Sequence, residues 1–158
     1  MTTDLKRRIL LKGSMAAGLT GAAVMTGLLT PKAVLAAWPA EGFAAKNAGE
    51  AITALYGSGD AADSADIKIK APEIAENGAV VPITISTDMD GVETISIIAA
   101  ENPVPLSAHY TLGEGALGYV STRIKMGKTG DVVAVIKAGG KLYSAKKPVK
   151  VTVGGCGG

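Results

Sequence analysis

The sequence predicts an all-β fold: an immunoglobulin-like antiparallel β-sandwich of about seven strands, with an N-terminal helix and a flexible C-terminal arm. Two observations support this prediction. Beyond residue 66, apolar and polar residues alternate in several short segments, as they do in strands with one solvent-facing side. Turn signals rich in glycine, asparagine and proline separate these segments. The 158 residues suit one modest domain with an additional segment.

Residues 1–36 have the layout of a signal peptide of the twin-arginine type. Arg7 and Arg8 precede an uncharged apolar run, and small residues favour cleavage after Ala36. The alternative is an ordinary secretory leader that happens to contain two arginines, but the glycine-rich, weakly hydrophobic run favours the twin-arginine type. We therefore expect a periplasmic protein that is exported folded by the twin-arginine route. Because that route moves folded cargo, a partner without a signal of its own could be carried across with it.

The formal net charge of +2 belongs to this leader. The leader contains five basic residues and one acidic residue, so the remaining chain has 11 basic and 13 acidic residues and a net charge of −2. Such a balance gives no electrostatic footprint for nucleic acid. No later segment approaches the roughly 18 apolar residues needed to cross a bilayer. We therefore expect neither nucleic-acid binding nor a membrane span.

The first structural element of the mature chain is a predicted helix over residues 39–56. Its apolar face recurs at the helical period, and Gly57-Ser58-Gly59-Asp60 ends it. The residues that form the predicted face are Ala44, Ala48, Ala51, Ile52 and Leu55. A linker rich in small and acidic residues follows, so we assign 37–64 to the helix and linker.

Residues 65–153 are assigned to the sandwich. Four segments alternate strictly, namely 67–70, 83–86, 120–126 and 149–153. The segment 131–137 is apolar on both faces, which predicts a central strand, and 93–99 and 106–112 are weaker candidates. Gly139-Gly140 predicts a two-residue hairpin between strands that end near Ala138 and start at Lys141. Asn77-Gly78, Asn102-Pro103 and Gly127–Gly130 are among the predicted turns.

Most of the motifs in this sequence are weak evidence for a functional site. A single Cys and a single His exclude an intrachain disulfide framework and a multi-Cys or two-His metal site, so no metal is expected. Gly113–Gly118 matches the dinucleotide pattern GxGxxG but lies between two strands without a following helix, so it predicts only a turn. His109 lies within a strand, and a structural role is expected. Five lysines surround the last hairpin and predict a solvated face, with an anionic substrate or acidic partner as the alternative: Lys137, Lys141, Lys146, Lys147 and Lys150.

Cys156 differs from these candidates because four glycines surround it in residues 154–158. Glycine gives the greatest backbone freedom, so Gly154 and Gly155 predict flexibility and reach. The five residues 154–158 together would span at most about 17 Å when extended. Gly157 and Gly158 keep the far side of the thiol narrow enough for a channel. The arm contains no cation or helix N-terminus to activate the thiolate. We therefore expect chemistry at the sulfur to depend on whatever active site the arm enters.

Three other interpretations of this terminus remain open. A carrier of the ubiquitin-like kind would hold a thiocarboxylate on Gly158, but this needs ATP-driven activation, which export makes implausible. A soft-metal module would bind a cation such as Cu(I) at Cys156, although the arm has no neighbouring Met or His ligand. An enzyme with a nucleophilic cysteine would need a base that the sequence does not place nearby.

The sequence resembles the SoxY family, the sulfur-carrier subunits of the thiosulfate-oxidising Sox system. The resemblance rests on the twin-arginine-like leader and on stretches in the mature chain. These stretches are 76–83 (ENGAVVPI), 101–106 (ENPVPL), 120–126 (VSTRIKM), 131–135 (DVVAV) and 154–158 (GGCGG).

The resemblance implies a carrier without its own enzymatic activity or dissociable cofactor. Pathway intermediates would be held covalently on Cys156: a haem-containing cytochrome partner joins thiosulfate oxidatively to the sulfur, a hydrolase releases sulfate, and the remaining sulfane sulfur is oxidised further or passed on. The resemblance also implies a heterodimer with a SoxZ-like subunit, a second sandwich that usually lacks a signal. This agrees with co-export of a partner.

Overall fold

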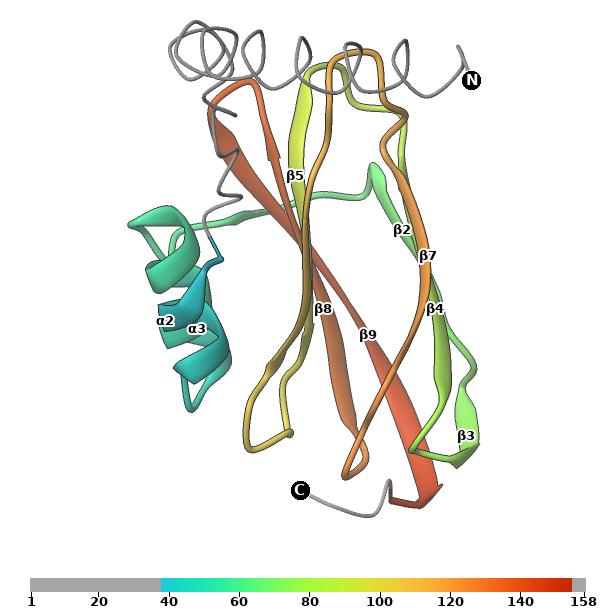
Figure 1. Cartoon of the computed structure of the whole chain (residues 1–158). Coiled ribbons are helices and arrows are strands. Elements are labelled where there is room, and N and C mark those ends of the chain that lie inside the picture. Colours follow the sequence, from blue (N-terminus) through green and yellow to red (C-terminus); the bar gives the residue numbers. More distant parts are fainter. Residues whose placement is uncertain (1–37, 155–158) are drawn as a thin grey trace, which may run out of the picture. The chain divides into compact units, whose positions relative to one another are not determined.

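The computed structural model describes residues 38–154 and confirms an all-β sandwich with a short N-terminal helical region (Figure 1). The helices are α2 (Ala40–Ala44) and α3 (Ala48–Tyr56). The strands within these residues are β1 (Ala62–Asp63), β2 (Ile67–Lys70), β3 (Ile74–Asn77), β4 (Val81–Thr87), β5 (Val92–Ala99), β6 (Leu106–Thr111), β7 (Tyr119–Ile124), β8 (Gly130–Ala138) and β9 (Lys141–Val153).

The strands form two sheets. One has the order β1-β9-β8-β5-β6, with β3 also paired to β9, and the other has the order β2-β4-β7. The predicted hairpin between β8 and β9 is confirmed: Ala138 pairs with Lys141 across Gly139 and Gly140, which both have positive φ, 55° and 75°. Two positive φ values are what the tight type I′ hairpin turn requires, and glycine adopts them without a steric cost.

The main core lies between the two sheets and is filled by the apolar residues of the alternating segments. Ile83 and Ile85 on β4 are fully buried, as are Ile95 and Ile97 on β5. The alternation predicted for 83–86 and for 120–124 is confirmed in β4 and β7. It places every second side chain of β4 and β7 in the core and leaves the others on the solvent side.

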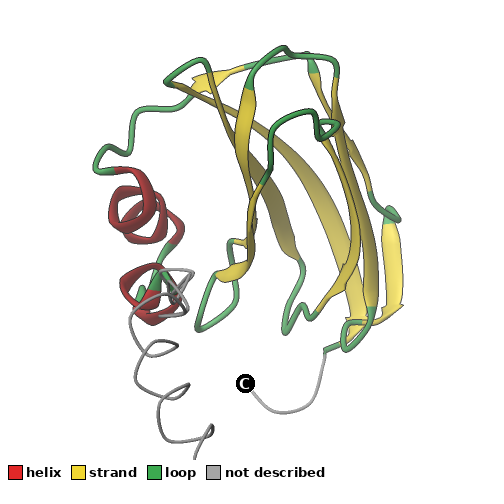
Figure 2. Ribbon diagram, turned by 45° about the horizontal axis from the view of Figure 1, so that its top comes forward, coloured by secondary structure: helices red, strands yellow, loops and turns green. Residues whose placement is uncertain are grey.

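The predicted central position of residues 131–137 is also confirmed, because β8 lies between β5 and β9. Ala134 and Ile136 face the main core, whereas Val135 belongs to a second core beneath the helices. Ala51 on α3 and Leu106 on β6 complete this second core. Figure 2 shows the two helices lying against one side of the strands. This cover explains why β8 carries apolar residues on both faces.

The prediction of one helix over residues 39–56 is wrong, because the chain forms two helices with a break at residues 45–47. The side chain of Asn47 accepts a hydrogen bond from Glu50 N (2.9 Å), and Glu50 Oε2 accepts one from Lys46 N (3.0 Å). Asn47 is therefore the N-cap of α3, and Glu50 binds the N–H of the residue directly before that cap, so a helix starts at this point. The break also alters the predicted apolar face, because Ala45 is buried while Ala44 is exposed. Gly57 ends α3 in the left-handed conformation, as predicted.

Two strands were not predicted, and both pair with β9 in parallel. β1 lies opposite residues 143–144 and β3 opposite residues 150–153. β9 extends beyond its pairing with β8, which ends where Gly130 meets Val149. The part of β9 beyond Val149 has backbone groups to which β3 binds, whereas β1 binds β9 at residues 143–144, where β8 also pairs with it. The sandwich is therefore antiparallel apart from these two pairs.

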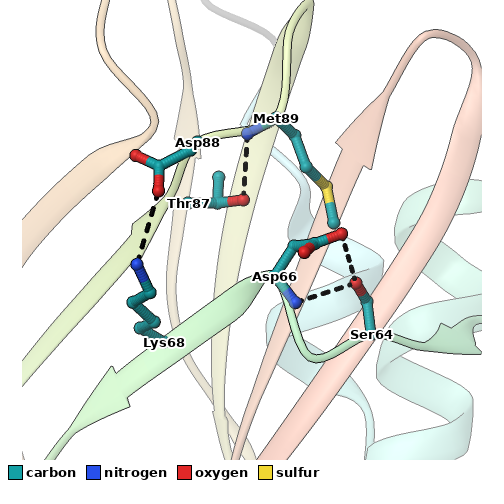
Figure 3. Close-up of polar contacts among 6 residues, drawn as sticks. All are labelled: Ser64, Asp66, Lys68, Thr87, Asp88 and Met89. Atoms are coloured by element: carbon teal, nitrogen blue, oxygen red, sulfur yellow. Dashed lines mark hydrogen bonds and ion pairs between the residues drawn. The ribbon is translucent and has the colours of Figure 1, made fainter.

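Polar contacts organise the linker before β2 and the end of β4 (Figure 3). Ser64 Oγ accepts a hydrogen bond from Asp66 N (3.2 Å), and Lys68 forms an ion pair with Asp88 (3.3 Å). Both side chains of this pair are highly exposed, so its contribution to stability is small.

Among residues 38–154, no helix is both long and apolar enough to cross a membrane.

Candidate functional site

The predicted sulfur attachment residue, Cys156, lies outside the described residues, as do Gly155, Gly157 and Gly158. Arg7 and Arg8 of the predicted export motif also lie outside them. The last described residue, Gly154, places the start of the predicted arm. We call this region the arm root, meaning Val151–Gly154 together with the residues that hold it: Gly78, Asn102, Met126, Gly127 and Thr129. In Figure 1 it lies where β9 ends, beside β3 and near the turn between β7 and β8.

The end of β9 is held on both of its edges. On one edge, Thr129 Oγ1 accepts a hydrogen bond from Val151 N (2.9 Å) and lies 3.3 Å from Val151 O. On the other edge, Val153 O accepts a hydrogen bond from Gly78 N (2.7 Å), which extends the pairing of β9 with β3. Thr152 Oγ1 adds a bond to Glu76 O (2.9 Å). The last residues of β9 are therefore anchored although β8 no longer pairs with them.

Gly78 links this anchor to the end of β7. Its N–H donates to Val153 O, and its carbonyl accepts from Met126 N (2.7 Å). Met126 itself is 1% exposed and packs in the main core. The buried side chain fixes the beginning of the turn between β7 and β8. The two backbone bonds of Gly78 connect this point to the end of β9.

Asn102 holds the next residue of the same turn. It lies in the loop between β5 and β6, and its Nδ2 donates to Lys125 O (2.7 Å). Its Oδ1 accepts from Gly127 N (2.9 Å). One carboxamide thus satisfies a carbonyl and an N–H of the turn, as a paired strand would. Successive N–H groups of Met126 and Gly127 are in this way bound from two different loops.

Gly154 packs against this turn. A β-carbon at position 154 would meet the carbonyl oxygen of Gly127, and the carbonyl carbon would be 3.3 Å away. Both atoms belong to backbone that cannot swing aside. Glycine is therefore required at this position for close approach, in addition to the flexibility predicted from the sequence.

The arm root brings together stretches that are distant in the sequence. It combines the ends of the stretches 76–83, 101–106 and 120–126 with the start of 154–158. Sequence analysis assigned Asn102 and Gly127 to turns and gave them no functional role. The available signal was that both Asn-Pro and Gly-Lys-Thr-Gly lie in or beside these stretches.

His109 lies elsewhere, on β6 beneath α3. Its Nδ1 is 2.8 Å from Ser96 Oγ, and Ser96 Oγ is 2.6 Å from the hydroxyl of Tyr56. The rings of Tyr56 and His109 meet edge to face at 6.1 Å. Burial lowers the pKa of His109 below its ordinary value, which favours the neutral imidazole. These contacts join a helix to a sheet, as expected for a structural role.

One of the five lysines around the last hairpin, Lys137, forms an ion pair. Lys137 Nζ lies 2.7 Å from Glu93 Oε2, and this contact and a bond from Gly140 N lower the pKa of Glu93. Lys137 and Lys141 line a pocket of about 600 Å³ beside α3, together with His109. Lys137 lies near the hairpin end of β8, whereas the arm root lies near its other end, at Gly130.

The glycine pattern at 113–118 joins β6 to β7 directly, as predicted, so no helix follows it.

Comparison with known proteins identifies the family. The family model described as sulfur oxidation protein SoxY matches residues 52–156. The structure of the sulfur carrier protein SoxY from Chlorobium limicola f thiosulfatophilum is similar, with 45% identity and a TM-score of 0.62 over 69% of this chain and 95% of that chain. Superoxide reductase (neelaredoxin) from Ignicoccus hospitalis matches at 21% identity and a TM-score of 0.47, over 54% of this chain and 79% of that chain. A search of curated proteins finds no match.

The family match begins within α3, ends at Cys156, and includes every strand that forms the arm root. The similar Chlorobium structure, which shares 45% identity with this chain, supports the same assignment. The chain belongs to the SoxY family of sulfur oxidation proteins.

Proposed function

We propose that this protein is a periplasmic sulfur carrier that holds the intermediates of thiosulfate oxidation covalently on Cys156 and presents them to partner enzymes. Membership of the SoxY family is the observation that carries the proposal, because the similar Chlorobium protein is a sulfur carrier. The arm root supports it. An anchored strand end leads through Gly154 to a thiol only two residues further along the chain.

The proposed chemistry begins with an oxidation at Cys156. The thiol and thiosulfate form a sulfur–sulfur bond, which releases one proton and two electrons to a haem-containing cytochrome partner. Hydrolysis of the bound –S–SO₃⁻ group then consumes one water and releases sulfate and two protons. A persulfide anion remains on the cysteine, and a sulfane-oxidising partner removes its outer sulfur or an acceptor receives it. The carrier is the substrate of each step and needs no cofactor of its own.

A tethered intermediate has an advantage over a diffusing one. An arm of four residues beyond Gly154 keeps the sulfur adduct within a small volume next to the domain, which raises its effective concentration for a docked enzyme. Because glycines flank the thiol, the adduct can enter a narrow channel. The partners we propose are therefore a SoxZ-like subunit in a heterodimer and the cytochrome, hydrolase and sulfane-oxidising Sox enzymes.

The test is the intact mass of the mature protein, purified without reductant and incubated with thiosulfate and its oxidising partner. We expect reductant-sensitive additions that match sulfur or sulfonate species and map to Cys156. Cys156→Ser should retain the fold and lose both the additions and thiosulfate-dependent turnover. Additions that map to the carboxylate of Gly158 would instead indicate a thiocarboxylate carrier. Turnover that persists in Cys156→Ser would refute the proposed function.

A further inference from the structure

We infer that Asn102 is a positioning residue that fixes the origin of the carrier arm. The inference rests on the proposed function, since it concerns the way the arm presents Cys156. Asn102 does not contact the arm directly. It acts through Gly127, which it binds and against which Gly154 packs.

Asn102 makes two bonds that no other side-chain type of its size can make together. Its Nδ2 donates to Lys125 O at 2.7 Å while its Oδ1 accepts from Gly127 N at 2.9 Å. A carboxylate could accept from Gly127 N but could not donate to Lys125 O. Asn102 is itself held, because its N–H donates to Ala99 O (3.1 Å) at the end of β5.

The loop that carries Asn102 is also fixed to β8. Ala100 N donates to Asp131 O (3.0 Å). The side chain of Glu101 lies over Gly130, where an added β-carbon would meet its Cβ at 3.0 Å. The loop with Asn102 is therefore attached to the end of β5 and the beginning of β8. The two side-chain bonds of Asn102 connect these strand ends to the turn between β7 and β8.

The last step is the contact between this turn and the arm. Met126 N and Gly127 N are bound by Gly78 O and Asn102 Oδ1, which hold the two peptide groups that directly precede the Gly127 carbonyl. That carbonyl lies where a side chain of residue 154 would be, so it forms a wall on one side of Gly154. Gly78 N holds Val153 O directly before it. Val153 and Gly154 are therefore held against the domain, and Asn102 keeps the wall beside Gly154 in place.

Loss of this wall would enlarge the volume that Cys156 explores. An effective concentration varies inversely with that volume, so it falls about threefold when the radius grows by half. For Asn102→Ala we expect the KM of the partner hydrolase for the loaded carrier to rise by about this factor. The kcat should remain unchanged, because the adduct that reaches the active site is the same.

A direct measurement uses the single native cysteine. One nitroxide on Cys156 and a second on Thr111→Cys, an exposed position of β6, give a distance distribution for the arm by double electron–electron resonance in the full mature chain. Asn102→Ala should broaden this distribution, and Asn102→Asp should have an intermediate effect because it keeps one of the two bonds. If Asn102→Ala does not fold, Asn102→Asp still tests the inference.

The matched control is Asn47→Ala, which removes another asparagine side-chain bond to backbone at a helix start. It should lower stability without changing the distance distribution or the KM. An unchanged distribution and an unchanged KM in folded Asn102 variants would overturn the inference. That result is distinguishable from failure of the proposed function, in which Cys156→Ser would retain turnover whatever the Asn102 variants do.

Discussion

Gly154 at the end of β9 lies so close to Gly127 in the turn between β7 and β8 that the Gly127 carbonyl occupies the place of a side chain at position 154. The two residues are 27 positions apart in the sequence, and neither has a side chain that could relieve the contact. The base of the predicted arm is therefore a packed junction, because Gly154 is fitted to the domain.

The first prediction concerns this junction. Gly154→Ala should lower the free energy of unfolding by about 1–3 kcal/mol, the usual cost of inserting a methyl group where backbone must move. Gly113→Ala is the matched control, because a β-carbon there has no neighbour within 4 Å and should change stability by less than about 0.5 kcal/mol. Chemical denaturation of both variants is the measurement. Equal stabilities would contradict the close approach.

The second prediction concerns the glycines beyond the junction. Gly155→Val or Gly157→Val should impair turnover with several partner enzymes while the thermal unfolding temperature stays that of the parent chain. The reason is that a branched side chain widens and stiffens the arm but has no part in the core. Kinetics with each partner and a thermal melt separate the two effects. Normal kinetics with every partner would count against entry of the arm into narrow channels.

The strands and their core could largely be predicted from the sequence because their signal is local. Alternation in β4 and β7 places Ile83, Ile85 and Val120 in the core whatever their partners are. The tight hairpin at Gly139-Gly140 is likewise determined by two adjacent residues that tolerate positive φ. These elements need no knowledge of distant contacts.

The missed features all depend on contacts between distant residues or on a cap. β3 is a strand only because β9 extends beyond β8 and offers an edge to Ile74–Asn77. The break between α2 and α3 did have a local signal, Asn47 followed three residues later by Glu50, which the helical period of the alanines obscured. Asn102 has no such signal, because its bonds reach residues 23 and 25 positions away.

The third prediction concerns the pH dependence of stability. Burial lowers the pKa of His109 in the folded state, so the folded protein binds this proton less readily than the unfolded chain does. The stabilisation from neutral His109 should be fully present above the unfolded pKa of about 6.5. It should be lost as the pH falls from there through the lower folded pKa.

His109 is the only histidine in the chain, so its contribution can be isolated. Denaturation curves between pH 7.5 and 5 should show a decline in the parent that is reduced in His109→Asn. Tyr56→Phe serves as a comparison, since it removes the hydroxyl bound to Ser96 and leaves the imidazole in place. It should lower stability by about 1 kcal/mol at neutral pH and retain the pH-dependent decline. A parent curve without any decline in this range would exclude the predicted effect.

The fourth prediction concerns export. If Arg7 and Arg8 are a twin-arginine motif, replacement of both by lysine should retain the charge of the leader and still abolish export, because the arginines would be read as a signal and not as charge alone. A SoxZ-like partner that is carried across with the folded chain should then accumulate inside the cell as well. The measurement is immunodetection of both proteins in periplasmic and cytoplasmic fractions, with Lys6→Arg as a control that changes a neighbouring basic residue. Normal export of both proteins in the double-lysine variant would show that the leader uses the ordinary secretory route. Export of the partner alone would show that it travels independently of this chain.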